Sequence, residues 1–110
     1  PQPKDLTLAL GSGEASLLEM TGAYATVARG GYPAHPVGVV EIRTKRGKSL
    51  YRQRPQSFTP LLSSRVASQI QTMLQGVMDY GTGRTVKLEG IKCAGKSGTS
   101  QHYRDAWFMK

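Results

Sequence analysis

The chain contains 110 residues, which is enough for one domain or for part of one. Hydrophobic residues make up 38% of the chain and charged residues 20%, a composition typical of a folded protein rather than of a disordered or membrane-spanning one. A single cysteine, Cys93, excludes an internal disulfide and a multi-cysteine zinc site. Because the chain also has only two histidines, we expect no bound metal and no cofactor.

Positive charge is concentrated in one segment of the chain. The net charge of +8 comes from 15 lysine and arginine residues against 7 acidic residues, and no acid lies between Glu41 and Asp79. Six of the cations fall within residues 43–54: Arg43, Lys45, Arg46, Lys48, Arg52 and Arg54. Such a cluster predicts a basic polyanion-binding module for nucleic acid, an anionic membrane or an acidic polymer, or else it is a solvated hairpin surface. Since only Tyr51 and Phe58 supply aromatic rings nearby, we expect no specific nucleic-acid partner.

The first predicted helix covers residues 17–29 and follows an irregular stretch over residues 1–15. Ser16 and Glu19 have the spacing of a capping box, and apolar residues then recur every three or four positions. The Gly30-Gly31 pair ends the helix, because glycine readily adopts the left-handed conformation found after a helix C-terminus.

Residues 37–54 predict a β-hairpin with a basic tip. β-branched residues dominate its first half, residues 45–48 form the turn, and the extended character resumes at Ser49. Lysines on an exposed strand also prevent edge-to-edge aggregation, which gives this charge a purely structural explanation.

A second helix is expected from Ser63 or Ser64 to Met78, because apolar residues recur there at helical spacing. After a tight glycine-rich loop, residues 92–100 and residues 106–109 have the character of extended segments. The predicted order is therefore helix, hairpin, helix and two strands, with no internal repeat and no linker long enough to divide the chain.

One segment matches a nucleotide-binding pattern. Residues Gly90–Ser97 fit the pattern G-x-x-x-x-G-K-S of the phosphate-binding loop, so nucleotide binding is an alternative function. That loop needs a hydrophobic strand before it and a helix after it. Residues 84–89 are polar and Gly98 follows the match, so we expect an extended segment here instead.

As a strand, the same residues form a different kind of site. Alternate side chains of a strand face the same side, so Lys96 and Gly98 would face one way and Ser97 and Thr99 the other. Gly98 has no Cβ and would let a bound backbone approach closely. A lysine beside two hydroxyl groups suits a peptide that carries a carboxylate. The alternative is a surface strand with an incidental lysine.

The segment Lys96-Ser97-Gly98-Thr99 resembles the K-[ST]-G-T motif of penicillin-binding proteins and serine β-lactamases. Other segments are similar to the transpeptidase domain of class A, bifunctional penicillin-binding proteins, in the same order and along nearly the whole chain. These segments are residues 8–12, 23–26, 30–32, 73–77, 81–84, 94–100 and 104–108. The set of segments is more specific than the motif alone.

The resemblance implies an α+β fold, in which a partial antiparallel sheet with flanking helices is a fragment of the penicillin-binding transpeptidase/β-lactamase-like fold. It also implies a peptidoglycan D,D-transpeptidase, which cross-links stem peptides by serine acyl transfer and binds penicillin. Lys96, Ser97, Gly98 and Thr99 would then bind the stem peptide or the β-lactam. Lys96 and the backbone N–H of Thr99, as an oxyanion-hole donor, would take part in catalysis.

Two further motifs of this family are missing from the chain. No serine is followed by a lysine three residues later, and a chain without asparagine cannot contain Ser-x-Asn. We therefore expect residues 1–110 to form the C-terminal part of a transpeptidase domain, inactive alone although the parent protein is an enzyme. Its expected partners include the remainder of that domain or a second copy. The expected location is the bacterial cell envelope, at the periplasmic face of the cytoplasmic membrane that anchors the parent protein.

Overall fold

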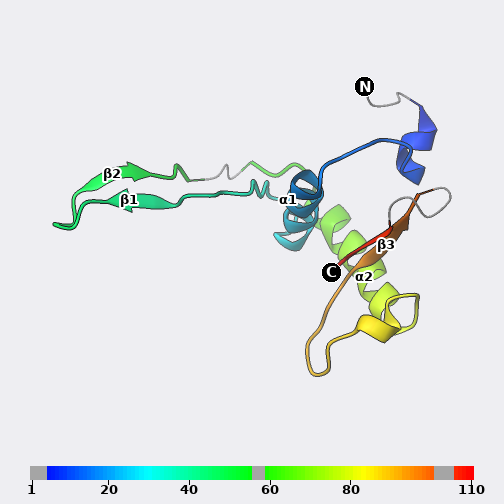
Figure 1. Ribbon diagram of the computed structural model, residues 1–110. Helices are drawn as coiled ribbons and strands as arrows, with labels where there is room; N and C mark the ends of the chain where they lie inside the picture. Colours follow the sequence, from blue (N-terminus) through cyan, green and yellow to red (C-terminus); the bar gives the residue numbers. More distant parts are fainter. Residues whose placement is uncertain (1–4, 56–58, 101–105) are drawn as a thin grey trace.

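The computed structural model describes residues 5–55, 59–100 and 106–110 of the chain. The fold is α+β, as predicted, and the described part holds two α-helices and two separate two-stranded antiparallel sheets (Figure 1). The two α-helices lie near the centre, and one β-hairpin projects well away from them.

The first element is a short 3-10 helix, η1 (Leu6–Leu10), where the sequence predicted an irregular stretch. Asp5 begins the helix by accepting a hydrogen bond from the backbone N–H of Thr7 at 3.0 Å, and Gly11 ends it with a φ of +88°. Local side-chain capping, rather than apolar periodicity, therefore creates this turn, and a search for apolar periodicity does not detect it.

The helix α1 (Leu17–Ala28) has the predicted start and ends one residue earlier than predicted. The Ser16 hydroxyl accepts from the backbone N–H of Glu19 at 3.1 Å, and the Glu19 carboxylate accepts from the backbone N–H of Ser16 at 2.9 Å. These two bonds complete the capping box. At the other end, the N–H groups of Gly30 and Gly31 donate to carbonyls of the last turn, and both glycines have positive φ. This pairing is a Schellman motif, which the Gly30-Gly31 pair predicted.

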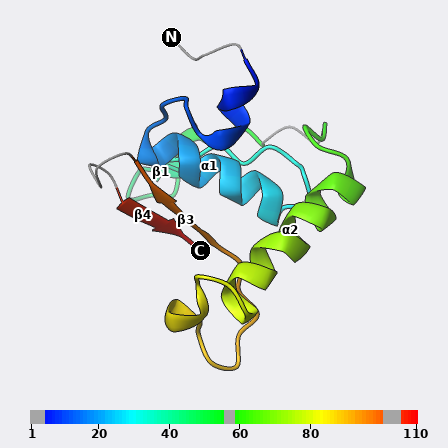
Figure 2. The same cartoon turned by 90° about the vertical axis from the view of Figure 1, so that its right-hand side faces the viewer.

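The helix α2 (Ser64–Asp79) runs at an angle to α1 and lies next to its C-terminal end (Figure 2). Ser63 caps it by accepting from the backbone N–H of Val66 at 3.2 Å. The side-chain amide of Gln71 donates to the carbonyl oxygen of Val27 at 2.7 Å and so joins the two helices. The second helix therefore begins at one of the two serines predicted for its start.

The strands β1 (Glu41–Arg43) and β2 (Ser49–Arg52) form the predicted hairpin, and the ladder is shorter than residues 37–54. Ile42 lies opposite Tyr51 in the register. The backbone pairing extends one step further, because the N–H of Gln53 donates to the carbonyl of Val40 at 2.8 Å. The hairpin contributes no side chain to the buried set in the described chain.

The strands β3 (Lys96–Thr99) and β4 (Ala106–Met109) form the second antiparallel pair. The sequence predicted an extended segment over residues 92–100, which is longer than β3. The reason for the difference is local: the N–H of Gly95 donates to the carbonyl of Leu74 in α2 at 3.1 Å and leaves the ladder. This contact ties the start of β3 to a helix.

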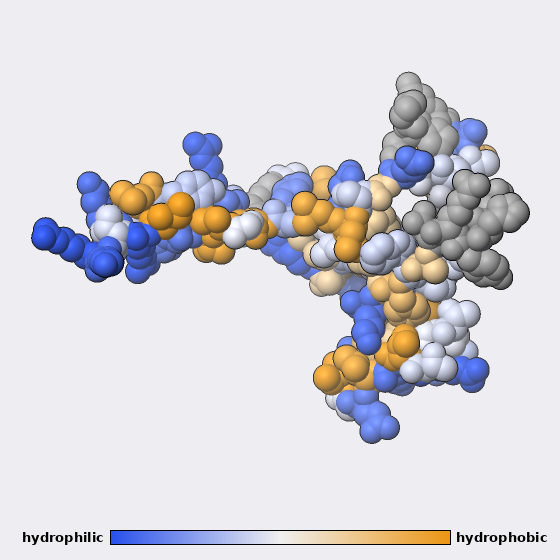
Figure 3. Space-filling model, viewed as in Figure 1, coloured by the Kyte–Doolittle hydropathy of each residue, from blue (hydrophilic) through white to orange (hydrophobic). Residues whose placement is uncertain are grey.

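The chain buries little of its surface. Its accessible area is 9399 Å², whereas an independently folded protein of 11.9 kDa exposes about 5,900 Å². Its radius of gyration is 17.4 Å, against about 13 Å for a compact domain of this length. Ala67 and Met78 are the buried hydrophobic residues of the described part, and Figure 3 shows hydrophobic side chains at the surface. No helix within the described ranges is long and apolar enough to cross a bilayer.

Candidate functional site

The site predicted from the sequence lies on β3. Lys96 pairs with Met109 across the ladder, and Thr99 pairs with Ala106. Ser97 therefore lies inside a strand, whereas a phosphate-binding loop would place it at the start of a helix. At the end of the match the structure therefore has a strand, which begins at Lys96, and not the helix that a nucleotide-binding loop requires.

Gly95, directly before the motif, fixes the position of β3. It is buried, and a Cβ at this position would lie 2.5 Å from the carbonyl oxygen of Met109 and 2.9 Å from the ring of Phe108. Only glycine fits so close to the neighbouring strand. Together with the bond from its N–H to Leu74, this close approach holds the start of β3 between β4 and α2.

A second glycine, Gly83, packs against β4 of the same strand pair. Gly83 is buried beyond the end of α2, and a Cβ there would lie 2.7 Å from the sulfur of Met78 and 3.0 Å from the ring of Phe108. Met78 is fully buried. The short 3-10 helix η2 (Arg84–Val86) follows, and the Lys110 ammonium donates to the carbonyl of Val86 at 3.2 Å. The end of α2, this loop and β4 therefore pack against one another.

The Lys96 side chain is exposed and lies along its own strand. Its ammonium donates to the carbonyl oxygen of Ser97 at 2.9 Å and lies 3.3 Å from the Ser97 hydroxyl. Strict alternation would place these two side chains on opposite sides of the strand, but the long lysine chain reaches its neighbour's hydroxyl. The site therefore offers a positive charge and a hydroxyl group at one place, which is a suitable arrangement for an anionic group.

Gly98 borders open space. A Cβ built there would meet nothing within 4 Å, in contrast to Gly95 three residues earlier. Gly98 and Thr99 are both exposed, and β3 pairs with β4 alone in the described part of the chain. The exposed edge of β3 is therefore accessible to another extended backbone.

Cys93 lies shortly before the motif. It is partly buried and lines a cavity of about 560 Å³ between α1, α2 and the chain that leads into β3. His102, Arg104 and Asp105, which the sequence places just beyond the motif, lie outside the described residues. Two serines far from the motif have a structural role, because the hydroxyls of Ser16 and Ser63 each cap a helix.

Sequence reasoning identified the motif but not the residues that hold it in place. Gly95 and Gly83 lie in two of the segments that resemble the family, residues 94–100 and 81–84, but the sequence alone predicted no role for them in placing β3. The position of Gly95 directly before the motif was the available signal. The contact of Phe108 with both glycines joins distant parts of the chain, and no local pattern predicts it.

Comparisons with known proteins identify the family of this chain. Residues 4–109 match the family model of the penicillin-binding protein transpeptidase domain. Penicillin-binding protein 1A of Rickettsia conorii is 31% identical and covers 98% of this chain, which corresponds to 17% of that protein. Penicillin-binding protein 4 of Bacillus subtilis is 32% identical over 84% of this chain and 15% of its own length.

A solved structure is also similar to this chain. The D,D-transpeptidase domain of a peptidoglycan glycosyltransferase from Eggerthella lenta superposes with a TM-score of 0.78 at 26% identity. It covers 97% of this chain and 27% of the solved chain. The chain thus spans about a quarter of that structure and about a sixth of the two relatives. Sequence and structure together confirm the resemblance, and the chain belongs to the penicillin-binding protein transpeptidase family.

Proposed function

We propose that this chain is part of a peptidoglycan D,D-transpeptidase, to which it supplies the strand that binds the substrate carboxylate. Strand β3 is the observation that carries the proposal. It has the sequence Lys-Ser-Gly-Thr, a start fixed by Gly95 and an open side at Gly98. Family membership adds the reaction, which is acyl transfer between stem peptides.

In this proposal, Lys96 and the two hydroxyl groups bind the carboxylate of the stem peptide or of a β-lactam. The ammonium of Lys96 supplies the charge, and the hydroxyls of Ser97 and Thr99 donate hydrogen bonds. Hydrogen bonds between charged partners are roughly twice as strong as neutral ones, so this contact fixes the end of the substrate. Gly98 leaves space for the acyl chain.

The backbone N–H of Thr99 is proposed as one donor of the oxyanion hole. The other donor would be the N–H of the nucleophilic serine, which belongs to a Ser-x-x-Lys segment outside these 110 residues. This serine attacks the carbonyl carbon of the penultimate D-alanine, and the terminal D-alanine leaves with a proton. The amine of a second stem peptide then takes the acyl group and the serine regains its proton. One oxyanion donor accounts for about 10²–10³ in rate.

The remainder of the transpeptidase domain is the proposed partner of this chain. The accessible area of 9399 Å² far exceeds that of a complete domain of this mass. We therefore expect another part of the protein to bury the exposed apolar side chains. Self-association of two chains through the same surface is the alternative. We place the parent protein in the bacterial cell envelope, at the periplasmic face of the cytoplasmic membrane, because its substrate is peptidoglycan.

Labelling with a fluorescent penicillin tests the proposed function. The whole protein and the isolated 110-residue chain are incubated with the reagent, and their intact masses and labelled peptides are determined. We expect one adduct on the whole protein, on a serine outside residues 1–110, and no adduct on the isolated chain. A whole protein that takes no label would overturn the proposed function. An adduct on the isolated chain would show that the nucleophile lies within these residues.

A further inference from the structure

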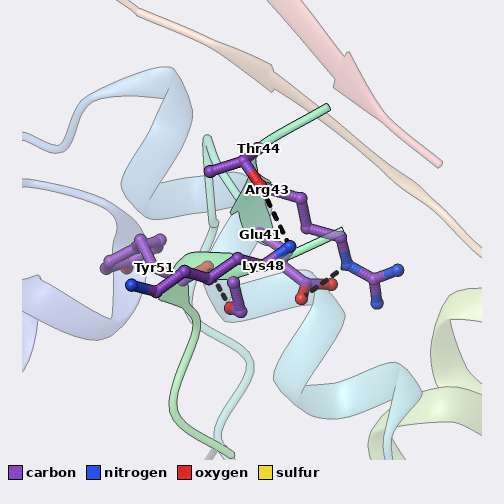
Figure 4. Close-up of polar contacts among 6 residues, drawn as sticks. Glu41, Arg43, Thr44, Lys48 and Tyr51 are labelled. Atoms are coloured by element: carbon purple, nitrogen blue, oxygen red, sulfur yellow. Dashed lines mark hydrogen bonds and ion pairs between the residues drawn. The ribbon is translucent and has the colours of Figure 1, made fainter. Parts of the chain in front are cut away.

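The tip of the β1–β2 hairpin is a closed, well-defined turn. Both backbone groups of Thr44 are paired. The Thr44 carbonyl accepts from the N–H of Gly47 at 2.9 Å, and the Thr44 N–H donates to the carbonyl of Lys48 at 2.8 Å. The Thr44 hydroxyl accepts from the N–H of Lys48 at 3.0 Å (Figure 4), and Gly47 has a φ of +88°. Lys45 and Arg46 occupy the two central positions of the turn, where their side chains are exposed.

Most cations of this hairpin lack an acidic partner in the described chain. Arg43 is the exception, because its guanidinium lies 2.8 Å from the Glu41 carboxylate (Figure 4). Arg52 lies opposite Glu41 in the strand register. The remaining four cations are exposed and belong to no ion pair in the described ranges: Lys45, Arg46, Lys48 and Arg54. We call these four residues the basic track.

Three residues of the basic track lie at the turn, at the free end of the hairpin. The fourth, Arg54, lies beyond the last residue of β2. Figure 3 shows hydrophilic surface at the free end of the hairpin and hydrophobic surface further back. The exposed apolar side chains of the hairpin, Val40 and Leu50 among them, therefore lie behind the charged tip. A hairpin that inserts into a bilayer would need the opposite order, with apolar side chains foremost.

We propose that the basic track binds a linear phosphodiester polymer without bases, of the kind found among the anionic polymers of a bacterial envelope. The exposed cations at the closed turn can contact neighbouring phosphates of such a polymer, and Arg54 can contact a more distant phosphate. The basic track is separate from the β3 site, and binding to it does not depend on acyl transfer. Nucleic acid fits less well, because Tyr51 is the one aromatic ring on the described hairpin and its hydroxyl donates to Gln53 at 3.1 Å.

The test uses long-chain inorganic polyphosphate, a phosphoanhydride chain, as a base-free substitute for the phosphodiester polymer. Its binding to the whole protein is measured by fluorescence anisotropy at several salt concentrations. Four contacts to a flexible polyanion predict that affinity falls with a log–log slope of about −3, or roughly 50-fold between 50 and 200 mM salt. The variant K45Q/R46Q/K48Q removes three of the four contacts, and its slope should be smaller in magnitude by about 2.

The matched control is R65Q/R84Q/K92Q, which removes the same charge from exposed positions outside the hairpin. This control should retain the slope of the unmodified protein. Both variants should keep penicillin labelling, which separates this inference from the proposed function. Vesicles of phosphatidylglycerol and an unstructured single-stranded DNA serve as competing probes.

The inference is overturned if the tip variant and the control bind polyphosphate alike, or if the unmodified protein does not bind it. It is also overturned if the tip variant weakens binding only to the vesicles, which would make the hairpin a membrane contact. Tighter binding to DNA than to polyphosphate of equal charge would favour nucleic acid instead.

Discussion

The chain contains two antiparallel strand pairs that are held in place in opposite ways. The pair β3–β4 is fixed by the rest of the chain, because Gly95 bonds to α2 and approaches β4 too closely for any side chain. In the described part of the chain, the pair β1–β2 is held by its own turn and ladder, and it projects from the helices (Figure 1). A site that must orient a reacting group needs the first kind of support, whereas a surface that attracts charge needs only exposure.

The largest effect is expected at Met78, which packs with Gly83 next to Phe108 of β4. Met78→Ala should lower the free energy of unfolding by about 2–5 kcal/mol, because the side chain is fully buried. Thermal unfolding of the transpeptidase domain measures the effect. The control is Met73→Ala, on the same helix, whose side chain is 65% exposed and should change stability by less than about 1 kcal/mol. Equal losses of stability in both variants would contradict the packing of the buried Met78 side chain beside β4.

Two glycines in the same segment should behave differently. Gly95→Ala should destabilise the domain by about 1–3 kcal/mol, because its Cβ overlaps the carbonyl of Met109. Gly98→Ala should leave the unfolding midpoint nearly unchanged, since open space surrounds it, and should slow penicillin labelling. Unfolding and labelling are therefore measured on both variants. A stable Gly95→Ala protein would show that β3 is not fixed by this contact.

Lys96 tests the site without disturbing the fold. Lys96→Ala should slow penicillin labelling by about 10–100-fold, the loss expected for one hydrogen bond to a charged group, while stability stays the same. Lys92→Ala is the control, since Lys92 is also exposed and lies before the motif. Labelling rates that fall equally in both variants would point to a general effect of charge.

The smallest effect is expected at the hairpin. The pKa of Glu41 lies below its usual range, chiefly because the Arg43 guanidinium donates to its carboxylate. The ion pair therefore favours the hairpin above the ordinary pKa of glutamate, and its contribution is lost as the pH falls through the lowered pKa. Amide exchange of the hairpin should rise slightly at low pH, and Glu41→Gln should remove this rise. A hairpin that melts in Glu41→Gln at neutral pH would show that the turn does not hold it.

Much of the fold was predictable because its signals are local. The capping box at Ser16, the Gly30-Gly31 pair and the turn at Gly47 each act over a few residues, and the structure shows all three. The strand character of the motif followed from the lack of a helix signal after Ser97. The element η1 (Leu6–Leu10) was missed, because its cap is also local but carries no apolar period.

The support of the site was less predictable, because it depends on contacts between distant residues. The sequence shows that Gly95 precedes the motif, yet its role depends on Leu74 and Phe108, which lie well apart along the chain. The length of β3 was overestimated for the same reason. The Lys96–Ser97 contact also required coordinates, since strand alternation separates their side chains.

A crystal structure of the whole protein after reaction with penicillin would show whether β3 binds the substrate carboxylate. We expect the penicillin carboxylate to lie within hydrogen-bond distance of the Ser97 and Thr99 hydroxyls. The carbonyl oxygen of the adduct should accept a hydrogen bond from the backbone N–H of Thr99. An adduct bound away from β3 would contradict the assignment of Lys96–Thr99 as the substrate-binding strand.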